Sequence, residues 1–245
     1  MGMPLVIGHA CAAGEAPANT LAGVRQCLDA GAAAEAMEID VQLCADGVPV
    51  LMHDETVDRT TSLRGPVREL SLAALQAANA GDGEPVPTLD QVLTLVAGRL
   101  TVMCELKATP GEPEYDQRLV DAVVDVIERH DAYTWTAIHS FNPVMVERAR
   151  NTQTSISATI IAPPLYGTDF ERLLAGVLKR NGQAISIEHS CVDREHVVAA
   201  KRRQLTIWTW TADKPEDWAR VTAAGVDGII TNVPHRLREW LARQR

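Results

Sequence analysis

Short apolar runs alternate with longer, helix-like segments along the whole chain. The apolar runs are Leu5–His9, Met37–Val41, Leu100–Glu105, Thr136–His139, Ser155–Ile161, Ala184–Glu188, Leu205–Trp210 and Gly228–Thr231. The helix-like segments are 19–30, 88–98, 115–130, 143–150, 169–179, 193–202, 215–224 and 234–243. Eight such β/α steps are the count that closes a barrel. The pattern therefore predicts an α/β fold, a single TIM-like (β/α)₈ barrel, with residues 1–245 as one domain.

One stretch interrupts the alternation after the second run. Residues 42–87 contain the hairpin-like sequence DGVPVLMHD and the polar turn TTSLRGP. This stretch is too long for an ordinary βα loop, so we expect a small insertion over the barrel mouth. A doubly wound parallel sheet is the weaker alternative, because no GxGxxG sequence follows the first run.

Composition agrees with a barrel and narrows the class of partner. Hydrophobic residues make up 46% of the chain and aromatic residues only 4%, which favours parallel strands covered by helices. The formal net charge of −9 argues against nucleic acid or an anionic membrane as the main partner. A small phosphorylated substrate stays compatible, because a bound divalent cation inverts the local charge.

The cysteines and the N-terminus indicate a soluble cytoplasmic protein. The five cysteines form no CxxC pair and are expected to be free thiols in a reducing compartment: Cys11, Cys27, Cys44, Cys104 and Cys191. The opening MGMPLVIGHA enters a strand pattern without a charged leader region. Apolar stretches stay below the roughly 18 residues of a membrane span, so we expect no stable membrane insertion.

Acidic residues lie where barrel strands are predicted to end, which is where such barrels carry their active sites. Glu38 and Asp40 are two residues apart and therefore share one face of a strand. Glu105 adds a third carboxylate one β/α unit further along the chain. Three carboxylates without neighbouring Cys or His pairs suit Mg²⁺ or Ca²⁺. The alternative is a set of salt bridges to barrel lysines and arginines.

Two histidines are candidates for general acid and base catalysis. His9 ends the first run, and His53 follows the apolar VPVLM sequence. His139 also ends a predicted strand and is the strongest competing histidine. The other four are expected to be ordinary surface or core residues: His130, His189, His196 and His235.

A lysine and a tryptophan complete the candidate site. Lys107 shares the spacing of Glu105 and is placed either to neutralise a phosphate oxygen or to pair with a carboxylate. Trp210, with Trp208 on the same face of its strand, could form an apolar wall for a substrate or could fill the core.

At the level of motifs, the first quarter of the chain resembles the glycerophosphodiester phosphodiesterase family. The segment VIGHACAAGEAPANTLAGVRQCLDAGAAAEAMEIDVQLCADGVPVLMHDETVDRTT is similar to the family signature HRG, PENT, ExDV, DGxxVxxHDxxLxRTT. The match continues in order through the ELK of MCELKAT, the SF of HSFNP, the WTxN-like WTAD and the sequence GVDGIITNVP. The resemblance implies a TIM barrel that cleaves a glycerophosphodiester to glycerol 3-phosphate and an alcohol.

The resemblance also implies roles for individual residues. Glu38, Asp40 and Glu105 match the family's ligands for one divalent cation. His9 and His53 match its catalytic histidines, Lys107 its phosphate-contacting lysine, and Trp210 its pocket aromatic.

The chain departs from the family pattern beside the first histidine. HRG is replaced by His9-Ala10-Cys11, and PENT by Pro17-Ala18-Asn19-Thr20, which reads as the loss of an ion pair. Cys11 adds a side chain where the pattern has glycine and could narrow the phosphate pocket. These changes motivate a second hypothesis, a phosphodiester-binding protein with weakened catalysis. A third hypothesis, independent of these changes, is an unrelated divalent-metal barrel such as an enolising lyase, which needs a lysine or histidine base near the metal that Lys107 could supply.

Overall fold

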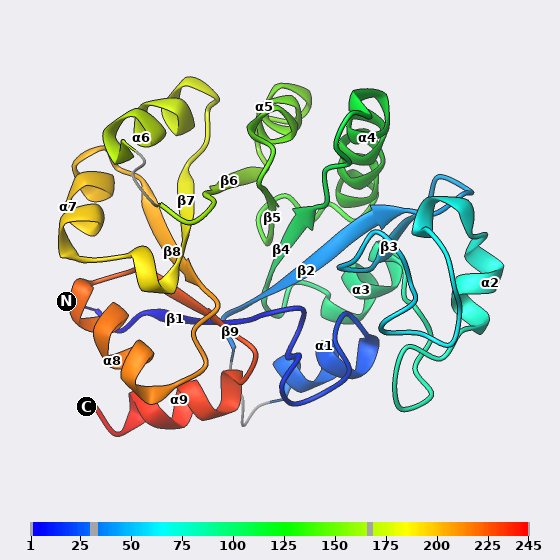
Figure 1. Ribbon diagram of the computed structural model, residues 1–245, viewed down its shortest axis with the longest axis horizontal. Helices are drawn as coiled ribbons and strands as arrows, with labels where there is room; N and C mark the ends of the chain where they lie inside the picture. The colour runs from blue at the N-terminus through cyan, green and yellow to red at the C-terminus, as the bar shows by residue number, and fades with distance from the viewer. Residues whose placement is uncertain (1, 30–33, 166–168, 245) are drawn as a thin grey trace.

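Eight parallel strands form a closed barrel in the computed structural model, which describes residues 2–29, 34–165 and 169–244 (Figure 1). The barrel strands are β1 (Leu5–Gly8), β2 (Ala36–Leu43), β4 (Thr101–Leu106), β5 (Thr136–Ser140), β6 (Ser157–Ile161), β7 (Ala184–Glu188), β8 (Thr206–Trp210) and β9 (Gly228–Thr231). They pair in the order β1-β9-β8-β7-β6-β5-β4-β2, and a β1–β2 pairing closes the ring. The predicted TIM-like barrel is confirmed.

Helices surround the strands on the outside of the ring (Figure 1). They are α1 (Leu21–Leu28), α3 (Leu89–Val96), α4 (Pro113–Arg129), α5 (Pro143–Thr152), α6 (Phe170–Lys179), α7 (Arg194–Arg202), α8 (Pro215–Ala224) and α9 (Pro234–Ala242). Each lies within two residues or so of its predicted range. The start of α1 is later than predicted, because Asn19 is left-handed (φ 56°) and the Thr20 hydroxyl caps the helix at Gly23 N. Residue 30, the predicted end of that helix, lies outside the described residues.

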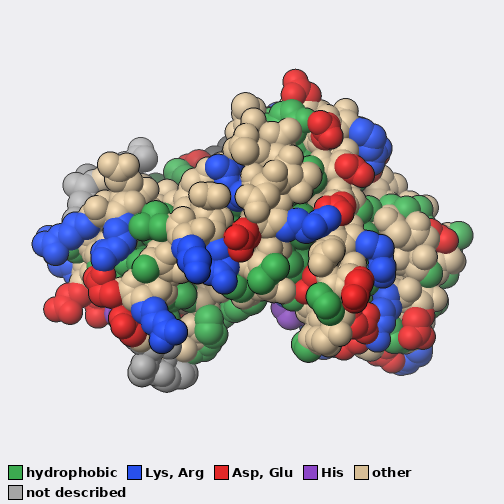
Figure 2. All heavy atoms as spheres, turned by 90° about the horizontal axis from the view of Figure 1, so that it is seen from above, with side chains coloured by type: hydrophobic (Ala, Val, Ile, Leu, Met, Phe, Trp, Pro, Cys, Tyr) green, Lys and Arg blue, Asp and Glu red, His purple; other side chains and the backbone are tan. Residues whose placement is uncertain are grey.

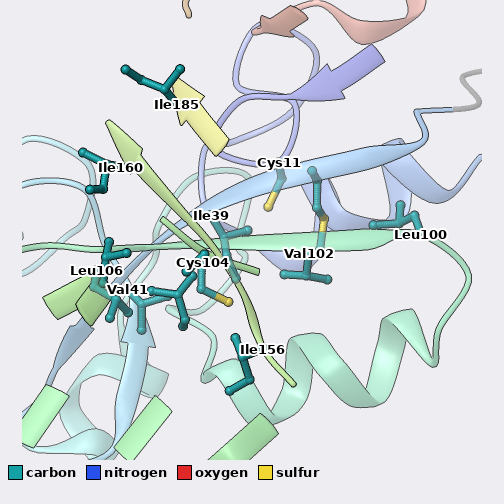
Figure 3. Packing of buried hydrophobic residues seen from close by; sticks show 14 of the residues in the cluster. Cys11, Ile39, Val41, Leu100, Val102, Cys104, Leu106, Ile156, Ile160 and Ile185 are labelled. Atoms are coloured by element: carbon teal, nitrogen blue, oxygen red, sulfur yellow. The ribbon is translucent and has the colours of Figure 1, made fainter. Parts of the chain in front are cut away.

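Strands β2 and β4 each contribute residues to the hydrophobic core on one face and to the candidate site on the other. Along β2, Met37, Ile39 and Val41 face outward into the main hydrophobic core, where Ile39 and Val41 pack with Val102 and Cys104 of β4 (Figure 3). The alternate residues point into the barrel. A small interior cluster that includes Ala36 and Met103 fills the barrel below them. The carboxylates of Glu38, Asp40 and Glu105 therefore point inward above an apolar floor.

The insertion at residues 42–87 is built on β2. Strand β3 (Pro49–Leu51) pairs antiparallel with β2, so the predicted hairpin is present, and a 3-10 turn (η1, Val67–Glu69) and α2 (Leu72–Ala77) follow. Val50, Val57 and Leu75 are buried in a separate apolar cluster beneath these elements. That cluster anchors the segment, so His53, directly after β3, is held beside the barrel mouth.

The net negative charge does not gather in one place on the face shown in Figure 2. Basic and acidic side chains lie beside one another across that face (Figure 2). Within the described residues, no helix has the length and apolar character needed to cross a membrane.

Candidate active site

Three buried carboxylates meet at the carboxyl ends of β2 and β4. One oxygen from each of Glu38, Asp40 and Glu105 lies within 4.8 Å of the others. The loop after β1 binds two of these groups. Ala10 N donates to Glu38 Oε2 (3.0 Å), and Asn19 Nδ2 donates to Asp40 Oδ2 (2.7 Å). Asn19 Oδ1 in turn accepts from Asp40 N (3.1 Å), so Asn19 clamps both ends of that residue.

Lys107 is the cation of this cluster. Its Nζ donates to Asp40 Oδ1 (3.2 Å) and to Glu105 Oε1 (2.6 Å). Although burial opposes its charged form, the carboxylates of Asp40 and Glu105 raise the pKa of Lys107. Burial, reinforced by repulsion from Asp40 and Glu105, raises the pKa of Glu38. One ammonium against three carboxylates leaves the cluster with a formal charge of −2 when all are ionised.

The donor set fits a divalent cation. Glu38 Oε1 is buried and has no hydrogen-bond partner in the structure, a costly state for a carboxylate oxygen. The residual charge of the ionised cluster matches a doubly charged ion, and the donors are all oxygens, as hard cations require. The residues of this chain thus offer a place for the cation that the sequence implied.

His9 is oriented by a chain of hydrogen bonds that starts at Asp213. The two oxygens of Asp213 accept from Asn232 N (2.8 Å) and Asn232 Nδ2 (2.6 Å), which turns Asn232 Oδ1 toward His9. His9 Nδ1 lies 2.7 Å from that oxygen and must carry the proton of the contact. His9 Nε2 is therefore the nitrogen free for chemistry, 3.9 Å from Glu38 Oε2.

His53 has a carboxylate partner. Its Nδ1 lies 2.7 Å from Asp54 Oδ1, and Arg59 binds both oxygens of Asp54 through Nε (2.6 Å) and Nη2 (3.0 Å). The Arg59 hydrogen bonds lower the pKa of Asp54 to about 2. Asp54 is thus a permanent acceptor, which leaves His53 Nε2 free. The His53 side chain is half exposed at the barrel mouth.

A cavity of about 250 Å³ brings most of the predicted site residues together. The predicted residues that line it are His9, Glu38, His53, Glu105, Lys107 and Trp210. Asp40 lies beneath them, fully buried, and is the exception. Trp210 meets Phe141 edge to face, with 5.6 Å between ring centroids, and both rings line the cavity. Trp210 is therefore a wall of the site. Both Trp210 and Trp208 pack against the interior cluster, but of the two only Trp210 lines the cavity.

His139 also lines this cavity, which sequence reasoning treated only as a competing possibility. It is buried, and neither ring nitrogen has a hydrogen-bond partner in the structure. Burial, assisted by the nearby charge of Lys107, lowers the pKa of His139 to about 3. The ring is therefore neutral at physiological pH. Its register partner on β4 is Glu105, a relation that could have marked it in the sequence.

The remaining histidines are placed as ordinary ion partners. Each lies within 4 Å of a carboxylate oxygen: His130 with Asp90, His189 with Glu188 and Asp217, His196 with Asp193, and His235 with Glu15. They are absent from the residues that line the cavity.

The expectation that Cys11 narrows the phosphate pocket is wrong. Cys11 is fully buried and packs in the main core with Ile39 and Val102, away from the cavity (Figure 3). Its φ of 72° turns the side chain toward α1, where its Cβ is 2.8 Å from the position that a Cβ on Gly23 would take. Ala10 and Ala18, in contrast, line one second cavity beside His9 and His53.

Several contributors were missed at the level of single residues. Asn19, Asn232, Asp213 and Arg59 hold the ligands and histidines through the contacts described above. All four lie inside family motifs: Asn19 in PANT, Asn232 in TNVP, Arg59 in RTT and Asp213 in WTAD. Motif membership was therefore the available signal, although it did not reveal which side chain each one holds.

Comparison with known proteins identifies the family of this chain. Residues 9–236 match the Glycerophosphoryl diester phosphodiesterase family. The chain is 30% identical over 242 residues to a glycerophosphodiester phosphodiesterase of Caldanaerobacter subterraneus, covering 95% of this chain and 96% of the other.

Solved structures agree as well. A crystal structure from Silicibacter pomeroyi superposes with a TM-score of 0.91 at 28% identity, covering 99% of this chain and 94% of that one. An Oleispira antarctica phosphodiesterase, in complex with the product sn-glycerol-3-phosphate, superposes with a TM-score of 0.86 at 25% identity, covering 98% and 97%. The chain thus belongs to the glycerophosphoryl diester phosphodiesterase family and is a phosphoric diester hydrolase of that type.

Proposed function

We propose that this chain hydrolyses glycerophosphodiesters to glycerol 3-phosphate and an alcohol with the help of one divalent cation, Mg²⁺ or Ca²⁺. The observation that carries the proposal is the meeting of three carboxylates, Lys107 and two oriented histidines around one cavity. The product bound to the Oleispira antarctica relative supports a glycerol 3-phosphate moiety as the common part of the substrate.

The cation would be held by Glu38, Asp40 and Glu105. When bound, it supplies Lewis-acid activation and a template for the phosphate. Lys107 Nζ, already placed between Asp40 and Glu105, offers a positive charge to the non-bridging phosphate oxygens. Trp210 and Phe141 form an apolar wall against which the glycerol carbons pack.

His9 and His53 form the proton-transfer pair. Their Nδ1 atoms are engaged by Asn232 and Asp54, so each exchanges protons with the substrate through Nε2. One takes the proton of the attacking hydroxyl, either water or the 2-hydroxyl of the glycerol. The other gives a proton to the alkoxide as the phosphorus–oxygen bond to the alcohol breaks. Overall, one diester and one water give glycerol 3-phosphate and one alcohol. When the 2-hydroxyl attacks, a cyclic phosphate forms as the alcohol leaves, and the water enters in a second step that opens the ring.

The test measures glycerol 3-phosphate released from sn-glycero-3-phosphoglycerol and sn-glycero-3-phosphocholine, with Mg²⁺, with Ca²⁺ and with EDTA. We expect release with a cation and loss of release in EDTA. Calorimetric titration of wild type and Glu38→Ala with each ion tests the ligands, and Asp125→Asn, on the exposed face of α4, is the matched control. Equal cation binding by wild type and Glu38→Ala would overturn the metal site, and binding of diesters without release would favour a binding protein.

A further inference from the structure

A second cavity adjoins the two histidines, separate from the one that Glu38, Glu105 and Lys107 line. Its volume is about 190 Å³. It is lined by His9, Ala10, Ala13, Ala18, Asn19, Met52, His53, Arg59 and Thr60. His9 and His53 also line the cavity of about 250 Å³ described above, which we call the carboxylate cavity. We call this second cavity the alanine cavity, after Ala10, Ala13 and Ala18.

Two ester arms leave the phosphorus of a diester in different directions. A phosphorus between His9 and His53 would adjoin both the carboxylate cavity and the alanine cavity, because both rings line both cavities. The glycerol 3-phosphate moiety takes the carboxylate side in the proposed function. The other arm, the alcohol that leaves, then faces the alanine cavity.

The side chains that line the alanine cavity favour one kind of alcohol. The three alanine methyls and the Met52 side chain are apolar. Besides the two histidines, polar character comes from Asn19, the Arg59 guanidinium and the Thr60 hydroxyl. The Thr60 hydroxyl donates only to the sulfur of Met52 (3.3 Å), a weak acceptor that a ligand hydroxyl can replace. The described residues that line this cavity include no carboxylate and no Phe, Tyr or Trp ring. A cationic head group therefore finds no carboxylate and no aromatic cage in this wall to bind it, and the cation that lines the wall, Arg59, is paired with Asp54.

Volume sets the size of the arm. A cavity of about 190 Å³ has about six times the ~30 Å³ share of one liquid water. That is room for an alcohol of the size of glycerol. The space exists in this chain because Ala10 and Ala18 stand where the family pattern has a long arginine and a glutamate.

We propose that the alanine cavity is the subsite for the leaving alcohol and that it selects a small uncharged polyol arm over a cationic one. The inference rests on the proposed function, because it assigns the second arm of the same diester. It predicts that wild-type kcat/KM for sn-glycero-3-phosphoglycerol exceeds that for sn-glycero-3-phosphocholine by about tenfold or more.

The test fills the cavity and compares three diesters that differ only in this arm: glycerol, choline and methyl. Ala18→Leu and Ala13→Leu each add three carbon atoms to the wall. We expect the ratio of kcat/KM for the glycerol arm to that for the methyl arm to fall by about tenfold or more. Ala73→Leu, on an exposed position of α2, is the matched control and should keep the wild-type ratio. Thermal melts establish that each variant is folded.

Calorimetric affinities for the same diesters separate this inference from the proposed function. If all three are hydrolysed and Ala18→Leu keeps the wild-type ratio, the subsite is overturned while the function stands. Suppose instead that no diester is hydrolysed, that the wild type binds the glycerol-arm diester more tightly, and that Ala18→Leu removes this preference. That result supports the subsite and overturns the proposed function. A wild-type preference for the choline arm, or no binding and no hydrolysis of any diester, overturns the subsite as well.

Discussion

The two cavities that share His9 and His53 are lined by different kinds of side chain. In the carboxylate cavity, charged groups are fixed by direct bonds, such as those of Lys107 to Asp40 and Glu105. In the alanine cavity, the wall beyond the histidines is mostly small or apolar, and its one guanidinium is already bound to Asp54. The first surface has a strong electrostatic preference, whereas the second discriminates through size and the absence of negative charge.

The difference suggests a division of labour around the reacting phosphorus. A fixed arrangement of charges stabilises a developing charge without reorganising, which is what the chemical step requires. Small apolar side chains admit an arm of limited size, and changes there alter the choice of substrate by modest factors. We therefore expect substitutions of the histidines to lower kcat the most. Substitutions of the alanines in the alanine cavity should change the preference between substrates more than they change kcat.

The largest effect is expected at the histidines that both cavities share. His9→Ala and His53→Ala should each lower kcat by about 10²–10⁴, because proton transfer has that typical worth. Steady-state kinetics on sn-glycero-3-phosphoglycerol with saturating cation measures it. The matched control is His196→Ala on α7, whose ring contacts Asp193 and Phe170 away from both cavities. A variant of His9 or His53 that turns over at the wild-type rate would make that ring structural.

The second effect concerns the clamp on Asp40. Asn19→Gly removes both side-chain hydrogen bonds to Asp40 and tolerates the left-handed backbone (φ 56°) at that position. Cation affinity should fall by about 10–100-fold, the usual cost of losing a partner that orients a ligand. Titration calorimetry with Mg²⁺ and Ca²⁺ gives the affinities.

The chain offers a close control for this change. Asn181 has the same φ of 56° on an exposed turn after α6, so Asn181→Gly changes the same residue type without touching the site. Its cation affinity should equal that of the wild type. An equal loss in both variants would trace the effect to the backbone and would contradict the role given to Asn19.

The carboxylate cavity was largely predictable from the sequence, for a physical reason. Glu38, Asp40 and Glu105 lie on strands whose period of two and shared direction place them at one end of the barrel. Charged residues inside such a run stand out against Ile and Val. The clamp by Asn19 did not stand out, because it joins residues 21 positions apart through a left-handed turn.

The alanine cavity is defined by side chains that are small, and small residues give no local signal. Only the departure from the family pattern at positions 10 and 18 drew attention to it. Cys11 was misplaced for a related reason. A φ of 72° reverses the direction in which an ordinary strand-end residue would point, and the sequence shows a cysteine there in place of the usual glycine.

The third prediction introduces a charged side chain into the alanine cavity. Ala10→Arg places a guanidinium in the alanine cavity beside the phosphate, where a charge-assisted contact is expected to raise kcat/KM for the methyl-arm diester by about tenfold. The same side chain fills the space for the glycerol arm, so kcat/KM for that diester should fall. Parallel kinetics on both diesters decide it, with Ala73→Arg on α2 as the control for added surface charge. Equal gains for both arms would contradict the assignment of the cavity.

The smallest effect concerns His139, the neutral ring that lines the carboxylate cavity. Its folded pKa of about 3 lies below the ordinary 6.5, so between these values the unfolded chain binds a proton that the folded chain does not. Stability must then fall as pH drops from 6.5 toward 3, by about 2 kcal/mol for this group at pH 5. The charges that act on the ring are those of Lys107, Asp40 and His9.

Removing the ring should remove that part of the pH dependence. His139→Leu cannot take up the proton in either state, so its Tm should fall less than that of the wild type between pH 7.5 and pH 5, by about 5 °C. Thermal melts at matched ionic strength measure the difference, and comparing slopes cancels any constant cost of repacking. Ala73→Leu on α2, which removes no titratable group, should keep the wild-type slope. Parallel slopes for wild type and His139→Leu would mean that the buried ring takes up its proton in the folded state.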